Sequence, residues 1–359
     1  MGWAVSAARN FVTGIKSRAK LNNKERIRRA VFFFPHYSLF IKKIRSILTA
    51  VSNRILTFSP ARAILNIENY HIKYIWRHTL KDLAYYNGKI SSIEDMRIPM
   101  LDRGCYFGDG VYDATFARNH IVWQLEEHVA RLYRSADALG IGIPHTPEEL
   151  CTLIRRLVTQ VDTGEQWVYF QVTRGTAPRN HAWGEMCHGN VWVMLRPTEM
   201  VDVYKKIKLI TVPDTRFLHC DIKTINLIPS VMASQKAEMA GANEAVLHRD
   251  GRVTEGSHSN IHIIKDGVFR TAPTDNLILP GIARANLIRY CGILGIPVRE
   301  EAFTLDEMME ADEIISSAVS RYCLAAEEID GKPVGGKAPE LLRALQDMAR
   351  KEVFEATDI

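Results

Sequence analysis

The sequence predicts a mixed α/β fold in two domains, preceded by a basic N-terminal segment. The 359 residues are enough for two domains of ordinary size, each with a sizeable core. Strand-like runs rich in β-branched and aromatic residues are interspersed with helix-like segments over residues 82–359. The charge changes sign near residue 81: residues 1–81 carry 16 Lys and Arg against two acids, a net charge of +14, whereas residues 82–359 have a net charge of −9. We therefore expect three parts: residues 1–81, 82–200 and 206–359.

The basic N-terminal segment has apolar residues at helical spacing between Ile41 and Ile55, with basic residues near the opposite side. Such a helix can lie on an anionic membrane surface, and its Arg-rich, acid-poor composition also resembles a transit peptide. We favour a third interpretation, in which translation starts at Leu80. If Arg77 is encoded by AGG, it forms a ribosome-binding sequence together with the TGG codon of Trp76. A TTG codon for Leu80, just downstream, would then serve as a bacterial start codon. We expect membrane contact only if residues 1–81 are translated, which N-terminal sequencing of native protein tests.

The six cysteines are scattered, without a CxxC pair or a Cys/His metal spacing. This pattern argues against a disulfide framework and a structural zinc site, and it suits a reducing cytoplasm. No run of 18 or more uncharged apolar residues occurs, so a membrane-spanning helix is not expected. We expect a cytoplasmic protein with no metal and no nucleic-acid partner.

The first domain, residues 82–200, is predicted to begin with a strand at 84–90 that turns at Asn87-Gly88. The glycines of segment 102–116 do not match GxGxxG, so we expect backbone that passes close to a ligand and does not open a dinucleotide-binding helix. Further along, the sequence predicts a helix at 125–140, a strand and loop at 166–183, a strand at 190–197 and a domain boundary at 197–205.

Three basic residues of this domain are candidates for a binding site. Arg131 lies beside the apolar stripe of the 125–140 helix, where a solvated arginine is the simpler interpretation. Arg179 and His181 lie in the loop after a strand, where an Arg-x-His pair can present donors to a carboxylate. Because loop arginines are common, the pair does not by itself establish a site.

The second domain, residues 206–359, is predicted to contain a strand at 206–212, a helix at 229–242 and hairpins at 244–267. Residues 275–295 predict a strand, a Pro280-Gly281 turn and a helix. The N–H groups at the start of such a helix form an anion site suited to phosphate. An ordinary turn explains the same residues equally well.

Lys223 stands in a mostly apolar run, LHCDIKTINLIPSV, at residues 218–231. Burying an ammonium group is costly unless it is neutralised, paired or covalently modified, and a lysine that extends to solvent is the alternative. A neutralised lysine is a nucleophile that can form a Schiff base with an aldehyde cofactor. That cofactor would also need a phosphate site, as the helix start near 280–284 offers, and an acid for its ring nitrogen, such as Glu255. Together the three features favour chemistry at Lys223.

From about residue 83 to about residue 355 the chain resembles the class IV (fold type IV) pyridoxal-phosphate aminotransferases, and most of all the D-amino acid aminotransferases. The motifs that carry the resemblance are DRGCYFGDGVY, EEHVARLY, YFQVTRGTAPRNH, CDIKTINLI, EAVLHRDGRVTEGSHSN, LILPGIAR and EEIDGK. The resemblance implies a small α/β domain, a larger domain of curved mixed sheets and helices, and pyridoxal 5'-phosphate in the cleft between them. Residues 1–81 lie outside it.

The resemblance also implies roles for individual residues. Lys223 matches the Schiff-base lysine that moves the proton, and Glu255 matches the acid that pairs with the pyridine nitrogen. Arg131 matches the phosphate-binding arginine, Leu279 the apolar residue that packs on the ring, and Ile282 and Ala283 the residues whose backbone amides hold the phosphate. Tyr112, Arg179 and His181 match the group that binds the substrate α-carboxylate. Arg179 and His181 would come from the other subunit of a homodimer.

The Arg-x-His pair is the feature that distinguishes the D-specific branch, because a carboxylate held on that side presents the Cα–H of a D-amino acid to Lys223. The resemblance therefore implies transfer of an amino group between D-alanine and 2-oxoglutarate, giving pyruvate and D-glutamate for bacterial cell-wall peptides. L-branched-chain aminotransferase and aminodeoxychorismate lyase activities are the alternatives within the same fold. A membrane-surface protein with a silent enzyme domain is the alternative outside it.

Two residues depart from the family pattern. Ala283 and Val319 stand where relatives carry hydroxyl residues near the phosphate. Each lost hydrogen bond to a charged acceptor costs about 1.5–3 kcal/mol. Ser257, Ser259 or Ser320 are candidates to compensate, so the strength of cofactor binding is left open.

Overall fold

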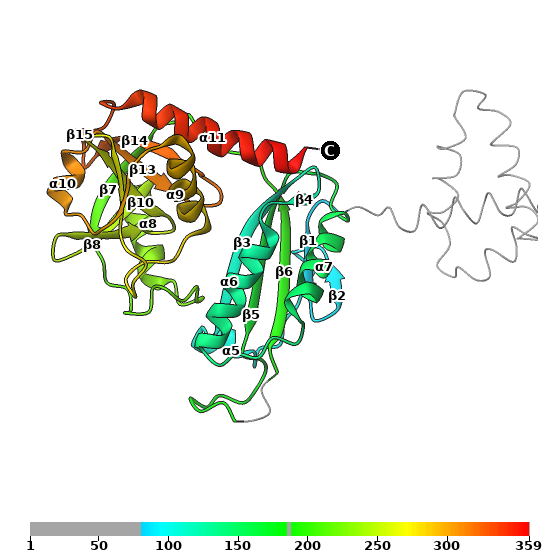
Figure 1. The fold of residues 1–359 in the computed structure, drawn as a ribbon. Coiled ribbons are helices and arrows are strands. Elements are labelled where there is room, and N and C mark those ends of the chain that lie inside the picture. The colour runs from blue at the N-terminus through cyan, green and yellow to red at the C-terminus, as the bar shows by residue number, and fades with distance from the viewer. Residues whose placement is uncertain (1–79, 185–187, 359) are drawn as a thin grey trace, which may run out of the picture. The chain divides into compact units, whose positions relative to one another are not determined.

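A computed structural model describes residues 80–184 and 188–358, which belong to one compact unit spanning His78–Ile359 (Figure 1). The amphipathic helix expected before residue 56 lies outside the described residues. Leu80, the first described residue, is hydrogen-bonded into the fold: its N–H donates to the Gln160 carbonyl at 2.8 Å, and its carbonyl accepts from the Asp162 N–H at 2.9 Å.

The first part of the described chain forms a six-stranded antiparallel sheet in the order β2-β1-β6-β5-β3-β4. Its strands are β1 (Leu83–Tyr86), β2 (Lys89–Ser91), β3 (Gly110–Arg118), β4 (Ile121–Val122), β5 (Gln166–Thr173) and β6 (Asn190–Pro197). Helices α6 (Leu125–Ala138) and α7 (Pro147–Val158) cover one face, and the short helix α5 (Arg103–Phe107) precedes β3 (Figure 1). These elements lie between residues 83 and 197, within the range for which the sequence predicts a small α/β domain.

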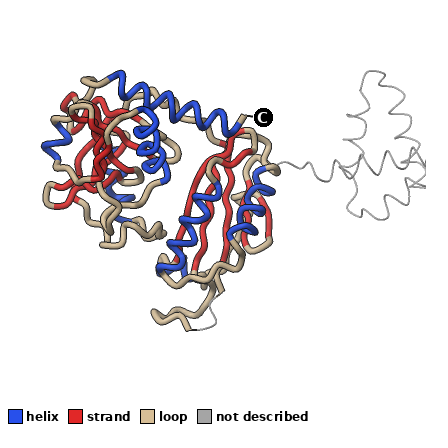
Figure 2. Tube along the Cα trace, viewed as in Figure 1, coloured by secondary structure: helices blue, strands red, loops and turns tan. Residues whose placement is uncertain are grey.

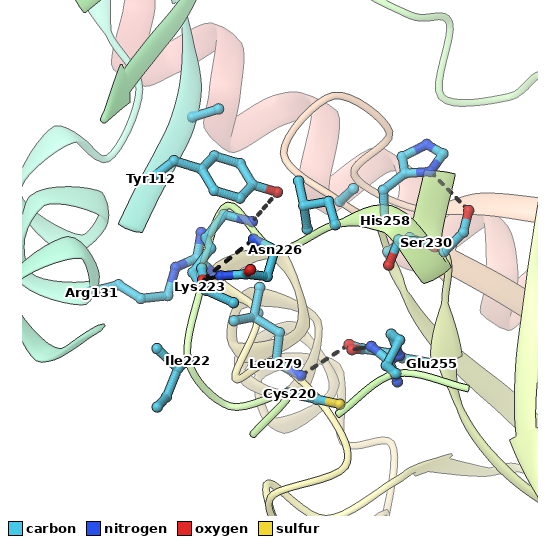
Figure 3. A pocket seen from close by; sticks show the side chains of 18 of the residues that line it. Tyr112, Arg131, Cys220, Ile222, Lys223, Asn226, Ser230, Glu255, His258 and Leu279 are labelled. Atoms are coloured by element: carbon cyan, nitrogen blue, oxygen red, sulfur yellow. Dashed lines mark hydrogen bonds and ion pairs between the residues drawn. The ribbon is translucent and has the colours of Figure 1, made fainter. Parts of the chain in front are cut away.

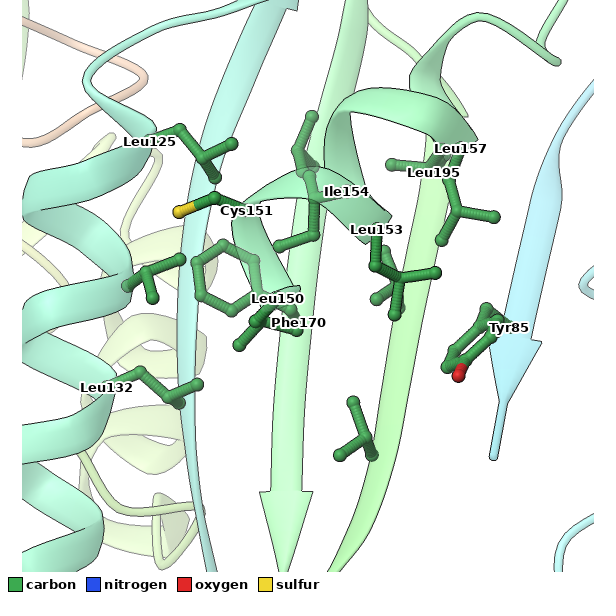
Figure 4. Packing of buried hydrophobic residues seen from close by; sticks show 14 of the residues in the cluster. Tyr85, Leu125, Leu132, Leu150, Cys151, Leu153, Ile154, Leu157, Phe170 and Leu195 are labelled. Carbon is green, nitrogen blue, oxygen red and sulfur yellow. The ribbon is translucent and has the colours of Figure 1, made fainter. Parts of the chain in front are cut away.

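The core of this domain follows directly from the sequence periodicities. Val168, Phe170 and Val172 alternate along β5 and are fully buried, as a strand with one covered face requires. Leu125 and Leu132 of α6 lie against the same sheet face (Figure 4). Val129, at helical spacing between them, belongs to the same buried cluster. Burial of these side chains holds α6, and therefore Arg131, in place on the sheet.

The second part forms a nine-stranded mixed sheet in the order β12-β11-β10-β13-β14-β7-β8-β9, with β15 paired to β14. Its strands are β7 (Ile207–Pro213), β8 (Glu244–Arg249), β9 (Arg252–Gly256), β10 (Asn260–Lys265), β11 (Val268–Thr271), β12 (Val298–Glu300), β13 (Glu313–Ser317), β14 (Leu324–Ile329) and β15 (Lys332–Pro333). Four helices accompany it: α8 (Ile228–Met239), α9 (Ile282–Leu294), α10 (Leu305–Met309) and α11 (Pro339–Thr357) (Figure 2). The pairs β7·β8, β7·β14 and β11·β12 are parallel.

Two local expectations were wrong. Residues 275–279, predicted as a strand, form a loop in which the Leu277 N–H donates to the Asp275 side chain at 2.9 Å, a turn interaction that replaces strand pairing. Residues 103–107, where no helix was expected, form the short helix α5 because Asp102 caps its start and Gly108, at φ 61°, ends it. The turn at Asn87-Gly88 is confirmed, with φ 44° and 89°. Within the described residues, no helix is both long and apolar enough to span a membrane.

Candidate active site

A cavity of about 530 Å³ is lined by residues of both sheets and of the segments that connect them. Most of the predicted site residues line it: Tyr112, Arg131, Lys223, Glu255, Leu279, Ile282 and Ala283. In the view of Figure 3, Arg131 and Glu255 lie on opposite sides of the labelled group, with Lys223 and Leu279 between them. The structure therefore brings together residues that are up to 171 positions apart in the sequence, from Tyr112 to Ala283.

Lys223 is held by hydrogen bonds between its own loop and the small domain. Its carbonyl accepts from the Tyr112 N–H on β3 at 3.0 Å, and its N–H donates to the Ser135 hydroxyl on α6 at 3.1 Å. Two residues on, the Ile225 N–H donates to the Gly110 carbonyl at 3.1 Å. The loop between β7 and α8 is thereby fixed to β3, which explains why an apolar run that forms no strand is nevertheless ordered around the lysine.

The Lys223 side chain is half-buried and points along the cavity. Its Nζ lies 3.4 Å from the Tyr112 hydroxyl and 4.4 Å from the centre of the Tyr112 ring. The Tyr112 ring in turn stacks on Tyr169, with 5.4 Å between ring centres. An amine with this exposure can reach a molecule bound in the cavity. Its contact with Tyr112 restricts the position of Nζ.

Glu255, at the end of β9, is a buried carboxyl with a defined set of donors. Its Oε2 accepts from the Asn260 side chain and from the Leu279 N–H, both at 3.0 Å, and its Oε1 pairs with Arg216. Burial raises the pKa of Glu255 to about 7, and the Arg216 charge opposes that rise. A carboxyl that titrates near neutrality is suited to share a proton with a ring nitrogen.

Arg216 is a site residue that sequence reasoning missed. Its guanidinium bridges Glu255 and Asp214, with Nε 3.0 Å from Asp214 Oδ1 and Nη2 2.8 Å from Asp214 Oδ2. It lies seven residues before Lys223 in the sequence, where the pattern PDTRF carries no recognisable signal. Because Arg216 belongs to the same loop as Lys223, its ion pair with Glu255 connects that loop to β9.

Arg131 is buried, so the interpretation of a solvated arginine was wrong. It forms two parallel hydrogen bonds to Asp113 on β3, Nε to Oδ2 and Nη2 to Oδ1, each of 2.8 Å. His128, one turn earlier on α6, contacts the same carboxyl at 2.7 Å, and Arg131 Nη1 donates to the Pro280 carbonyl at 3.3 Å. Burial would raise the pKa of Asp113, but Arg131 and His128 hold it well below its usual range. Asp113 therefore stays ionised and fixes both basic side chains.

The start of α9 offers backbone donors on the same side of the cavity. Gly281 is its N-cap residue, and Ile282 and Ala283 are its first helical residues, whose N–H groups have no acceptor within the helix. These N–H groups and the guanidinium of Arg131 are the donor set that a phosphate group requires. The predicted compensating serines are engaged elsewhere in part: Ser257 and Ser259 both donate to Glu244, Ser259 at 3.2 Å.

Arg179 and His181 are exposed and do not line the cavity of their own chain. The backbone of their loop is held by Arg103, whose Nη1 donates to the Asn180 carbonyl at 2.6 Å. Both side chains lie against the Phe107 ring, with the Arg179 guanidinium carbon 5.0 Å and the His181 ring centre 5.0 Å from its centre. The loop is thus presented outward in a defined conformation.

Comparisons with known proteins establish the family. The model of the family described as amino-transferase class IV matches residues 110–329. The chain belongs to the class IV aminotransferases. It is 36% identical over 275 residues to a D-alanine aminotransferase of Bacillus licheniformis, covering 76% of this chain and 97% of that protein. A D-alanine aminotransferase of Listeria monocytogenes is 39% identical over 276 residues, with 75% and 96% covered.

Solved structures of the family agree in fold. A branched-chain aminotransferase of Thermoproteus uzoniensis superposes with a TM-score of 0.70 at 25% identity, covering 77% of this chain and 96% of that one. The predicted family, fold type and transaminase class are therefore confirmed, and the aminotransferase uses pyridoxal phosphate. The residues present fit that cofactor: an amine, a carboxyl whose pKa burial raises to about 7, and a helix start with backbone N–H donors line one cavity. The individual residue roles stay predictions.

Proposed function

We propose that this aminotransferase acts on D-amino acids, moving the amino group of D-alanine to 2-oxoglutarate to give pyruvate and D-glutamate. The 36% and 39% identities to proteins named D-alanine aminotransferases support this substrate class. The observation that carries the proposal is the Arg179-x-His181 pair, held on an exposed loop with its side chains available to a carboxylate.

The residues around the cavity divide the work of the reaction. Pyridoxal phosphate, when bound, supplies a sink for the electron pair left behind when the Cα–H bond breaks. Lys223 Nζ removes the Cα proton from one amino acid and returns a proton to Cα of the other. Glu255 holds a proton at the ring nitrogen, and Arg131 with the N–H groups of Ile282 and Ala283 binds the phosphate. Leu279 packs beside the ring.

The substrate carboxylate is the feature that selects the enantiomer. A carboxylate bound by Tyr112, Arg179 and His181 directs the Cα–H bond of a D-amino acid, and not of an L-amino acid, toward Lys223. The same base then serves both half-reactions, because both substrates are bound by their shared α-carboxylate. The preference for one enantiomer thus depends on where the substrate carboxylate binds, because Lys223 is in the same position for both enantiomers.

Arg179 and His181 act, in this proposal, on the cavity of a partner subunit in a homodimer. Two features support it: the pair does not line the cavity of its own chain, and α8 next to the lysine loop exposes Ile228, Val231 and Met232, which are 71%, 58% and 59% exposed. Exposed apolar side chains of this size on a helix are typical of a surface that another chain covers. We also propose a cytoplasmic location, where five free cysteines among the described residues would stay reduced.

The second candidate activity is that of the L-branched-chain aminotransferases, favoured by the structural similarity to the Thermoproteus uzoniensis enzyme of that name. The chirality of the product separates the two. The purified protein is incubated with D-alanine and 2-oxoglutarate, and the glutamate formed is resolved on a chiral column. We expect D-glutamate, and no product when 2-oxoglutarate is omitted, which also separates a transaminase from a lyase. L-glutamate, or pyruvate formation without an acceptor, would contradict the proposal.

A further inference from the structure

Arg103, on the short helix α5, is a buried charged residue to which the proposed reaction gives no role. It is 2% exposed, and a guanidinium buried to this extent requires partners for its N–H groups. Its Nε donates to Asp109 Oδ2 at 2.8 Å, in an ion pair whose side chains are 3% and 13% exposed. Because the guanidinium is planar, this pair also fixes the directions of the remaining N–H groups.

Those N–H groups bind the backbone of the loop that carries Arg179 and His181. Arg103 Nη1 donates to the Asn180 carbonyl at 2.6 Å, and Nη2 donates to the His181 carbonyl at 3.3 Å. These carbonyls belong to the peptide groups before and after His181. One side chain therefore connects both peptide groups that flank the histidine to a shielded carboxylate.

The loop depends on such contacts because it has no regular structure of its own. Residues 178–184 are exposed and belong to no helix or strand. Other side chains of α5 contact the loop as well: the Tyr106 hydroxyl donates to the Ala177 carbonyl at 2.5 Å, and the Phe107 ring contacts both side chains of the Arg-x-His pair. Helix α5 thus supports the loop through several side chains.

We infer that α5 positions the Arg179–His181 pair for the substrate carboxylate, with Arg103 as the principal positioning residue. The inference rests on the proposed role of the pair, since Arg103 itself does not line the cavity. A carboxylate is bound well when its donors converge on it, and a loop that samples several conformations presents them correctly for only part of the time. The apparent affinity falls by that fraction. The hydrogen bonds from Arg103 to the loop backbone keep the fraction high.

This role predicts a change in KM and not in kcat. The pair binds the carboxylate equally in the ground state and in the transition state, so weaker positioning raises KM alone. Arg103→Lys keeps a charge for Asp109 but cannot reach both carbonyls, and we expect KM for D-alanine and for 2-oxoglutarate to rise about 10-fold. Tyr106→Phe alters no buried charge and should raise both KM values less. Arg156→Lys, at an exposed position of α7, is the control.

Combined substitutions test whether Arg103 acts through the pair. Asp109 lines the cavity of its own chain, so Arg103→Lys offers a second route to the same loss. The substitution is therefore repeated in a background that carries Arg179→Ala and His181→Ala, and kcat/KM for D-alanine is measured. We expect its effect to shrink to about twofold or less, because the loop then presents no donors. The same effect in both backgrounds, or an unchanged KM in both Arg103→Lys and Tyr106→Phe, would overturn the inference.

Trypsin measures the loop without any substrate. Cleavage after Arg179 requires the chain on both sides to enter the protease in an extended form, so the bonds from Arg103 to the next two carbonyls must open first. The cofactor-loaded proteins are digested, and mass spectrometry gives the rate at this bond. We expect Arg103→Lys to be cleaved about 10-fold faster than wild type and than Arg156→Lys.

The outcomes separate this inference from the proposed function. Equal cleavage rates after Arg179 would contradict the positioning role of Arg103 while the proposed carboxylate role of the pair stands. An unchanged KM in Arg179→Ala would contradict the proposed function and the inference with it.

Discussion

At the residue scale, Lys223 combines two properties that a proton-transferring amine needs: a side chain that reaches the cavity and a backbone that is held in place by hydrogen bonds. The backbone of its loop is hydrogen-bonded to β3 and α6, and its Nζ lies 3.4 Å from the Tyr112 hydroxyl. Ile222, directly before it, packs against the core of the small domain, while Lys223 lines the cavity. Its position therefore follows from the contacts of its neighbours.

Replacing Lys223 should abolish the reaction without unfolding the protein. We expect Lys223→Ala to lower kcat for D-alanine by at least about 10²- to 10⁴-fold, the usual contribution of a general base. Lys332→Ala, at an exposed lysine of β15, is the matched control and should keep full activity. Borohydride reduction of the loaded wild-type protein followed by peptide mapping should place the label on Lys223, and near-normal turnover of Lys223→Ala would refute its role.

A separate prediction concerns Glu255, which in the proposed function interacts with the ring nitrogen of the cofactor and not with the substrate. Glu255→Gln can keep a hydrogen bond from the Leu279 N–H but cannot hold a proton for the ring. We expect kcat to fall about 10- to 100-fold, the equivalent of one charge-assisted hydrogen bond, while the enantiomer preference is kept. Steady-state kinetics with D-alanine measure this, with the exposed Glu301→Gln as control. A changed ratio of D to L activity would place Glu255 in substrate recognition instead.

At the element scale, β10 carries a buried polar group that links sheet stability to pH. His262 on this strand has Nδ1 2.9 Å from the Thr271 hydroxyl and Nε2 2.7 Å from the Ser317 hydroxyl, so β10 is joined to β11 and β13 through side chains as well as backbone. Burial lowers the pKa of His262 to about 3, with the Arg284 charge adding to the effect. The folded protein therefore excludes a proton that the unfolded chain binds below about pH 6.5.

This difference predicts loss of stability in acid. A group with a lowered pKa stabilises the fold above its unfolded pKa, and that contribution is lost as pH falls from about 6.5 toward 3. Between pH 7.5 and 5.0 the contribution of His262 to the free energy of unfolding should fall by about 2 kcal/mol. Urea unfolding of wild type and His262→Gln at both pH values measures it. The variant should lose about 2 kcal/mol less than wild type, and parallel losses in both proteins would contradict the assignment.

The elements differ in how well the sequence could predict them. β5 and β6 were predictable because their apolar residues alternate along the strand, as one covered sheet face requires. α6 was predictable because its apolar stripe ends where Gly140 terminates the helix. The loop at 275–279 was not predictable from its apolar residues, because the Asp275 side chain accepts from the Leu277 N–H and so forms a turn. Lys223, Glu255 and Arg131 could be found from the motifs, whereas Asp113 and Arg216 could not, since only tertiary contacts reveal which charges meet.

At the scale of the whole molecule, the proposed site needs two chains. Lys223 lines the cavity of its own chain, whereas Arg179 and His181 do not. If the pair acts on the partner subunit, two inactive variants that fail in different parts should complete one site between them. The proposed arrangement is thus testable without a structure of the dimer.

Mixing Lys223→Ala with Arg179→Ala subunits, after dissociation and reassembly, should restore activity. Random pairing makes half of the dimers mixed, and each mixed dimer has one complete site, so we expect about a quarter of wild-type activity. A mixture of Arg179→Ala with His181→Ala is the control and should stay inactive, since every site then lacks part of the pair. Absence of restoration in a mixture that light scattering shows to be dimeric would place Arg179 in its own subunit's site.

The enantiomer preference is the most direct test of the proposed substrate class. The measurement is kcat/KM for D-alanine and for L-leucine, each with 2-oxoglutarate as acceptor, on the same preparation of cofactor-loaded protein. We predict that D-alanine exceeds L-leucine by about 10²-fold or more, because the L-enantiomer cannot bind its carboxylate at Arg179 and also present its Cα–H to Lys223. Activity confined to L-leucine would contradict the proposed function while leaving the family, the fold and the cofactor in place.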